Sequence, residues 1–147
     1  MAEKKYKYLE DVATADIAFE AWGDTIEELF VSCAKATTDA MVELSDVNPK
    51  VSRKVEVSEK TEGVEMLLYN FLSEIIFYKD AETLFFSEFK IKITNSRTKL
   101  NATMIGEELN KKIQFKNDVK AITMHMLKII KKNTVKNKYH ATIVLDI

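Results

Sequence analysis

The sequence is organised around one stretch, VATADIAFEA (Val12–Ala21), which has the alternating pattern of a β-strand. Alternation divides its side chains between two faces, with Ala15, Ile17 and Phe19 on one and Thr14, Asp16 and Ala18 on the other. Aspartate is depleted in strand interiors because its short carboxylate competes with the ladder and resists burial. Asp16 therefore requires an explanation, and the far end of the chain offers one.

The last residues, Val144 to Ile147, form a second strand-like run with a second aspartate. If the two strands pair, Asp16, Asp146 and the terminal carboxylate of Ile147 form a compact oxygen-rich site. Oxygen groups without nitrogen or sulfur ligands suit a hard cation, so such a site predicts Ca²⁺ or Mg²⁺. The other interpretation is that each aspartate is solvated at a strand rim or caps a turn. Spacing alone leaves both interpretations open.

Length and composition predict a globular protein with one domain, residues 1–147. One proline and three glycines leave little room for flexible linkers. The single cysteine, Cys33, excludes an intramolecular disulfide and a cysteine-based metal site, which favours a reducing compartment. No apolar segment follows the N-terminus and no run approaches the ~20 apolar residues of a membrane span, so we expect a cytoplasmic protein without a signal peptide.

The charge distribution is uneven although the net charge is only −1. Residues 89–138 hold 13 Lys+Arg and 3 Asp+Glu, a balance of +10, and the remainder holds 9 and 20, a balance of −11. Such asymmetry is typical of a surface for a partner of opposite sign, for example RNA or an enzyme that acts on nucleic acid. The alternative is that lysines protect exposed edge strands from aggregation.

The order of predicted elements indicates an α+β fold. One helix is expected to begin at Asp24 and to stop before Asn48-Pro49, with Thr25 and Glu28 at capping-box spacing; a second runs from Val64 to about Lys79. Strands are expected at 6–9, 12–21, 51–57, 84–93, 100–106, 113–115, 119–130 and 139–147. We predict a two-layer sandwich in which two main helices pack on one mixed or mostly antiparallel sheet. Apolar residues on both faces of 119–130 predict a central strand covered twice.

Enzyme signatures are missing from the sequence, which has no Walker loop, dinucleotide fingerprint, zinc-protease motif or nucleophile elbow. Cys33 lies on an apolar helical stripe and is interpreted as a core thiol. His125 falls among apolar residues and is interpreted as a packed sheet histidine, with a catalytic role as the alternative. Lys120 is either a solvated lysine or, if it shares a face with the carboxylates, a functional one. A metal-dependent hydrolase using Asp16 and Asp146 would need more ligands, or a base, than the sequence offers.

Several motifs together resemble the archease family. They are TADI (14–17), AWGDTIEE (21–28), LYNFL (68–72), FSEF (86–89), VKAITMH (119–125) and the final LDI (145–147). The resemblance runs from about Tyr6 to the last residue. It implies a non-enzymatic cofactor of the RtcB-type RNA ligase, which joins tRNA halves. Such a cofactor promotes guanylylation of the ligase's active-site histidine, supports multiple turnover and can broaden nucleotide use.

The resemblance also implies a site and an alternative role. The family's metal site maps onto Asp16, Asp146 and Ile147. The alternative function is a chaperone-like modulator of enzymes that act on nucleic acid, including a tRNA methyltransferase. Two departures concern the site: Ala13 stands where the family often has histidine, and Ala18 where it often has glycine.

Overall fold

The computed structural model describes residues 4–10 and 16–147. Within them the strands are β1 Tyr6–Leu9, β2 Asp16–Gly23, β3 Val51–Ser58, β4 Leu84–Ile93, β5 Lys99–Glu108, β6 Ala121–Lys131 and β7 Tyr139–Asp146. The helices are α1 Ile26–Met41, α2 Val64–Glu82 and the short 3₁₀ helix η1 Leu44–Asp46.

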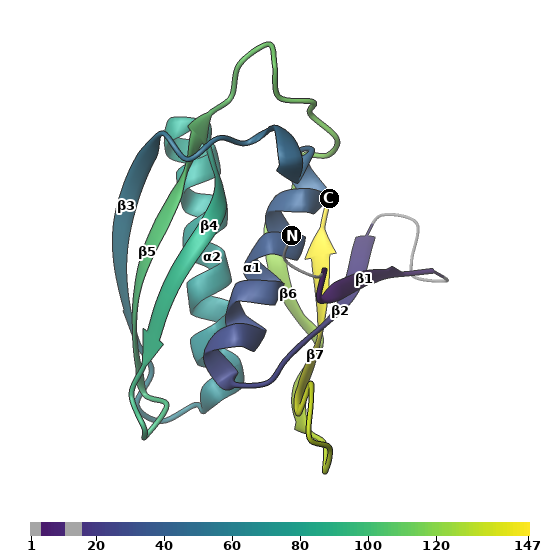
Figure 1. Cartoon of the computed structure of the whole chain (residues 1–147), viewed down its shortest axis with the longest axis vertical. Helices are drawn as coiled ribbons and strands as arrows, with labels where there is room; N and C mark the ends of the chain where they lie inside the picture. Colours follow the sequence, from purple (N-terminus) through teal and green to yellow (C-terminus); the bar gives the residue numbers. More distant parts are fainter. Residues whose placement is uncertain (1–3, 11–15) are drawn as a thin grey trace.

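The strands form two antiparallel sheets with both α-helices between them (Figure 1). One sheet has the order β1-β2-β7-β6 and the other β3-β5-β4. Both α1 and α2 contact strands of both sheets. The predicted α+β sandwich is confirmed, and its strands divide between two sheets rather than forming the single sheet expected.

The helices themselves explain the second sheet. Ala34, Ala36, Thr38 and Asp39 of α1 point in different directions around the helix, and all are buried. A helix that is buried around most of its circumference must be covered on more than one side. One sheet covers only one side of such a helix, so the remaining strands form a layer on the other.

In the described part of β2, the side chains divide between the two faces of the strand as alternation predicts. Ile17 and Phe19 pack on the helical core, whereas Asp16 and Ala18 belong to the opposite face. The predicted start of this strand, residues 12–15, lies outside the described residues.

The capping box predicted for α1 is present. The Thr25 side chain accepts a hydrogen bond from the Glu28 backbone N–H at 3.1 Å, and the Glu28 carboxylate accepts one from the Thr25 N–H at 3.1 Å. The helix ends at Met41, earlier than expected, because Val42 leaves it to form a β-bridge with Phe115. The segment 113–115, for which the sequence predicts a short strand, forms only this isolated bridge and no strand.

The prediction of a central, doubly covered strand at 119–130 is wrong. β6 pairs only with β7 and lies at the edge of its sheet. Its register shifts between Thr123 and Lys128, so four residues bulge opposite a single partner residue, and Met126 has a left-handed backbone with φ of 61°. His125 lies in this bulge and is exposed, so it is not the packed histidine expected. Alternation in a sequence cannot show a register shift, which depends on the partner strand.

No helix in residues 4–10 and 16–147 is both long enough and apolar enough to cross a membrane.

Candidate metal centre

The two aspartates singled out by the sequence face each other across β2 and β7. Asp16 is the first residue of β2, Asp146 is the last of β7, and the two are direct partners in the antiparallel register. Directly opposed residues project to the same face, with Cβ atoms about 5 Å apart. The strand pairing on which the predicted site depends therefore exists.

The pair lies on the outer face of the four-stranded sheet, away from the helices. Their neighbours Ile17 and Leu145 point inward, where Leu145 is fully buried. Both aspartates are half-buried. Ile147 packs its side chain against the core, which anchors the backbone next to Asp146. The Lys120 N–H donates to the Asp146 backbone carbonyl at 2.8 Å and holds the end of β7 from the β6 side.

Two like charges are thus placed opposite each other without a described counter-charge. No ion pair within residues 4–10 and 16–147 involves the carboxylate of Asp16 or Asp146. No third His, Cys, Asp or Glu in the described part of the chain joins them as a metal-binding group. Directly opposed like charges destabilise a sheet, and a cation between them removes that cost. The donor set is all oxygen and fits a hard divalent ion.

Cys33 and Lys120, the other candidates, form no described ion pair with the side chain of Asp16 or Asp146. Cys33 is fully buried in α1, and burial raises the pKa of its thiol far above the ordinary value, so it is a core thiol as predicted. The Lys120 side chain is exposed and makes no ion pair with a described carboxylate.

A second polar group on the same outer face was missed from the sequence. Glu20 and His140 pair across β2 and β7, with 3.2 Å between a carboxylate oxygen and Nδ1, and the His140 ring stacks on Trp22 at 6.2 Å. Alternation places Glu20 on the face of Asp16, which is the only local signal. Its partner lies near the other end of the chain and becomes evident only from the register.

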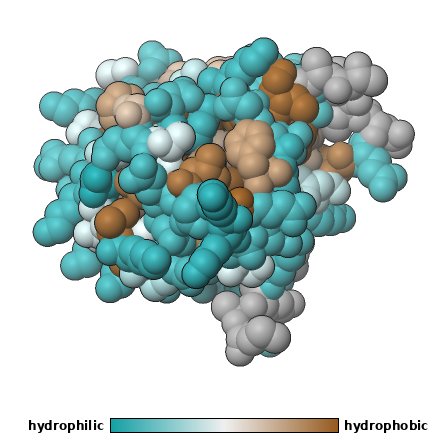
Figure 2. Space-filling model, turned by 90° about the horizontal axis from the view of Figure 1, so that it is seen from above, coloured by the Kyte–Doolittle hydropathy of each residue, from teal (hydrophilic) through white to brown (hydrophobic). Residues whose placement is uncertain are grey.

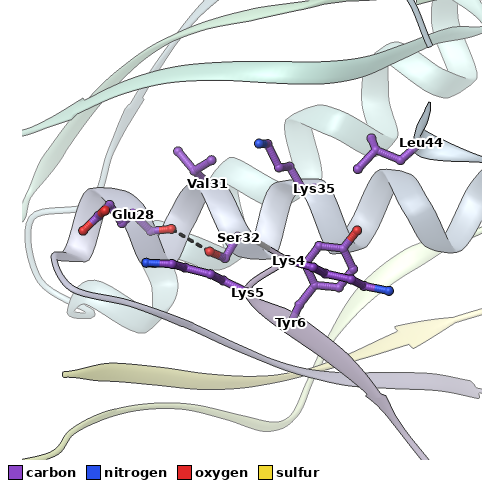
Figure 3. A pocket seen from close by; sticks show the side chains of 8 residues that line it. All are labelled: Lys4, Lys5, Tyr6, Glu28, Val31, Ser32, Lys35 and Leu44. Carbon is purple, nitrogen blue, oxygen red and sulfur yellow. Dashed lines mark hydrogen bonds between the residues drawn. The ribbon is translucent and has the colours of Figure 1, made fainter. Parts of the chain in front are cut away.

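A hollow of about 380 Å³ lies between β1 and α1, on the other side of the four-stranded sheet (Figure 3). Its lining includes the lysines Lys4, Lys5 and Lys35 together with the apolar Val31 and Leu44. The Ser32 hydroxyl there donates to the Glu28 carbonyl at 2.9 Å and to the Trp22 carbonyl at 2.8 Å. The hydrogen bond to Trp22 joins α1 to β2, so the serine has a structural role.

The end of the molecule toward which β7 runs is largely hydrophilic. Viewed from above, hydrophilic residues cover most of the surface, and hydrophobic ones gather near its middle (Figure 2). This face therefore has the character of an ordinary water-exposed surface with a limited apolar area.

The fold and the paired carboxylates define an α+β sandwich with an acidic pair at the end of one sheet, and known proteins are similar to this chain in sequence. The chain matches the model of the Archease protein family over residues 6–147. A protein archease of Thermococcus kodakarensis is 43% identical over 131 residues, which are 87% of this chain and 89% of that protein. One from Methanothermobacter thermautotrophicus is 35% identical over 136 residues, 91% and 94% of the two chains. This chain belongs to the archease family.

Solved structures agree with this assignment. The solution structure of Methanobacterium thermoautotrophicum protein 1598 has a TM-score of 0.81 at 32% identity, covering 99% of this chain and 100% of that one. The crystal structure of a Thermotoga maritima protein, described as an archease and possible chaperone, has a TM-score of 0.65 at 18% identity, with 92% and 93% coverage. The second likeness concerns the fold alone. The name archease, which the relatives carry, specifies no reaction.

Proposed function

We propose that this protein is a non-enzymatic cofactor of an RtcB-type RNA ligase in tRNA splicing. It promotes ligase guanylylation and multiple turnover and broadens nucleotide use, acting in the cytoplasm. Its proposed functional group is a divalent cation, Ca²⁺ or alternatively Mg²⁺, held by Asp16, Asp146 and the terminal carboxylate of Ile147. Membership of the archease family supports the partner. The register pairing of Asp16 with Asp146 is the observation that supports the site.

The chain's own residues bind and position. Asp16 and Asp146 hold the cation on the outer sheet face, and the partly buried Ile147 side chain keeps the chain end beside them. A divalent cation neutralises negative charge on a phosphoryl group and needs no nucleophile from the protein that carries it. Within the described residues no third His, Cys, Asp or Glu joins the pair, and the Cys33 thiol is buried, which fits an accessory protein better than a hydrolase.

The test is ligase guanylylation and multiple-turnover ligation with wild type, Asp16→Ala and Asp146→Ala. We expect either variant to lose stimulation by about tenfold or more, because weakening a metal site's ligand set commonly costs at least that much. Glu62→Ala is a matched control, since it removes an exposed carboxylate in the loop before α2. Full stimulation by folded Asp16 and Asp146 variants would overturn the metal site.

The second candidate is a chaperone-like modulator of RNA- and DNA-processing enzymes such as a tRNA methyltransferase. Exposed apolar side chains on β6, namely Met124, Met126 and Ile130, favour it. Methionine surfaces adapt to varied partners. This role predicts that aggregation of a purified methyltransferase is suppressed equally by wild type and by Asp16→Ala, and is lost when Met124 and Met126 are replaced by serine.

A further inference from the structure

The hairpin that joins β6 to β7 carries a concentrated positive charge. We define the arm as residues 128–138, whose five lysines are all exposed: Lys128, Lys131, Lys132, Lys136 and Lys138. No aspartate or glutamate occurs between residues 121 and 145. None of the five lysines forms an ion pair with a described carboxylate, in contrast to Lys50, Lys79 and Lys116 elsewhere in the fold.

The arm projects beyond the ends of the helices (Figure 1) and is internally ordered. The Lys132 N–H donates to the Lys138 carbonyl at 2.6 Å, and the Thr134 hydroxyl donates to the Lys136 carbonyl at 2.9 Å. The Asn137 N–H donates to the Asp24 carboxylate at 2.5 Å, which ties the arm to the start of α1. Asp24 is thereby engaged with the backbone, and the lysines are presented on a held scaffold.

Strand alternation distributes the charges over two hollows on opposite sides of the sheet. The outer hollow, about 310 Å³, includes Lys128, Lys132 and His140 in its lining, together with Glu20. The inner hollow, about 250 Å³, includes Lys131, Lys138 and Arg97, with Asp24 and Glu27 at the α1 end. Arg97 comes from the β4–β5 turn, so residues far apart in the sequence meet here.

An aromatic ring lies among the cations of the inner hollow. Arg97 Nη2 donates to the Tyr139 hydroxyl at 3.2 Å, and both Arg97 and Lys131 lie over the Tyr139 ring, at 5.4 and 5.9 Å from its centroid. The Arg97 hydrogen bond holds the pKa of the Tyr139 hydroxyl below its ordinary value. Cations gathered around an aromatic ring match the phosphates and bases of a single nucleic-acid strand.

We infer that the arm, with Arg97 and Tyr139, is a binding surface for single-stranded RNA that engages the phosphodiester backbone without reading sequence. Unpaired lysines release counterions when they meet phosphates, whereas paired ones must first break an ion pair. A flexible strand can pass around the hairpin and reach both hollows. A stiff duplex can lie against only one of them. This surface is separate from the proposed metal site and does not depend on the proposed function.

The experiment measures binding of a short labelled oligouridine to the full chain by fluorescence anisotropy over a series of salt concentrations, with no ligase present. The test variant is Lys128→Gln/Lys132→Gln/Lys138→Gln, which removes lysine charges from the linings of both hollows. The control is Lys54→Gln/Lys90→Gln/Lys92→Gln, which removes the same charge from exposed lysines around a hollow in the three-stranded sheet. Circular dichroism verifies that both variants are folded.

We expect the arm variant to bind at least about tenfold more weakly, and the slope of log K against log salt to fall by about 2, since each single-strand phosphate contact contributes about 0.7. The control should keep wild-type affinity and slope, and a duplex of equal length should bind more weakly than oligouridine.

Equal losses in both variants, equal binding of duplex, or no binding by wild type at low salt would overturn the inference. So would an arm variant that binds RNA normally but loses association with the ligase, which would assign the arm to an acidic protein surface. Asp16→Asn should leave RNA binding intact, so failure of the metal proposal remains distinguishable.

Discussion

Asp16 and Asp146 are the residues whose placement is most informative, because the fold aligns two like charges without a described cation beside them. A calcium ion that binds the folded state stabilises it by mass action. We expect added Ca²⁺ to raise the thermal midpoint of wild type and to leave that of Asp16→Asn unchanged. In a chelator, the same variant should be more stable than wild type by about 0.5–1 kcal/mol, since it removes an opposed charge pair.

The measurement is thermal unfolding by circular dichroism with and without Ca²⁺, repeated with Mg²⁺ to identify the preferred ion. Glu62→Gln serves as the control, because its carboxylate is exposed in a loop. An equal Ca²⁺ response in wild type and Asp16→Asn would show that the ion binds elsewhere.

Among the elements, the contact between β1, α1 and the loop before β6 depends on one buried carboxylate. Asp39 of α1 accepts hydrogen bonds from the Tyr6 hydroxyl at 2.9 Å and from Lys116 Nζ at 3.1 Å. The Leu44 N–H donates to it at 3.2 Å. The sequence does not reveal these hydrogen bonds, because Asp39 has the pattern of an ordinary polar helix residue. Its partners come from three separate segments of the chain.

Asp39 predicts a dependence of stability on acid. Burial by itself raises the pKa of this carboxyl, but the hydrogen bonds from Lys116, Tyr6 and Leu44 outweigh burial and hold the pKa below its ordinary value. A carboxyl with a lowered folded pKa contributes stability above its unfolded pKa, near 4, and loses it as the pH falls through the folded value. Asp39→Asn should cost about 1.5–3 kcal/mol at neutral pH, and its deficit should shrink below about pH 4.

Urea unfolding at a series of pH values measures that deficit. Glu62→Gln should show a small difference from wild type that does not change with pH. A deficit of Asp39→Asn that stays constant down to pH 3 would contradict the assigned role of the carboxylate.

For the whole molecule, the two sheets share one core through the helices. Phe71 of α2 is fully buried, stacks on Phe30 of α1 at 6.1 Å and meets Phe89 of β4 edge-on at 6.4 Å. The same hydrophobic cluster continues to Phe19 and Ile143 of the four-stranded sheet. Cooperative unfolding of both layers is the consequence, because neither sheet can bury its inner face without the helices.

Phe71→Ala should therefore lower the free energy of unfolding by about 3–5 kcal/mol, a large part of the total for a domain of this size. Unfolding in urea is followed by circular dichroism for the whole chain and by fluorescence of the single Trp22 for the four-stranded sheet. The two signals should move together. Phe77→Ala is the control on the same helix, because Phe77 is 57% exposed and its loss should cost less than about 0.5 kcal/mol. Separate transitions for the two signals would show that the sheets unfold independently.

The sequence by itself determined the local elements: the alternation of β2, the Thr25–Glu28 capping box, the apolar stripes of both helices, and an aspartate near each end of the chain. These depend on interactions over a few residues, which a pattern records. Only the tertiary structure decided that Asp16 faces Asp146, that β6 is an edge strand with a bulge, that Asp39 gathers Tyr6 and Lys116, and that Arg97 meets the arm. Each of these joins segments distant in the chain. Their pairing is selected by burial of the whole core, because no local pattern records which strand will lie beside which.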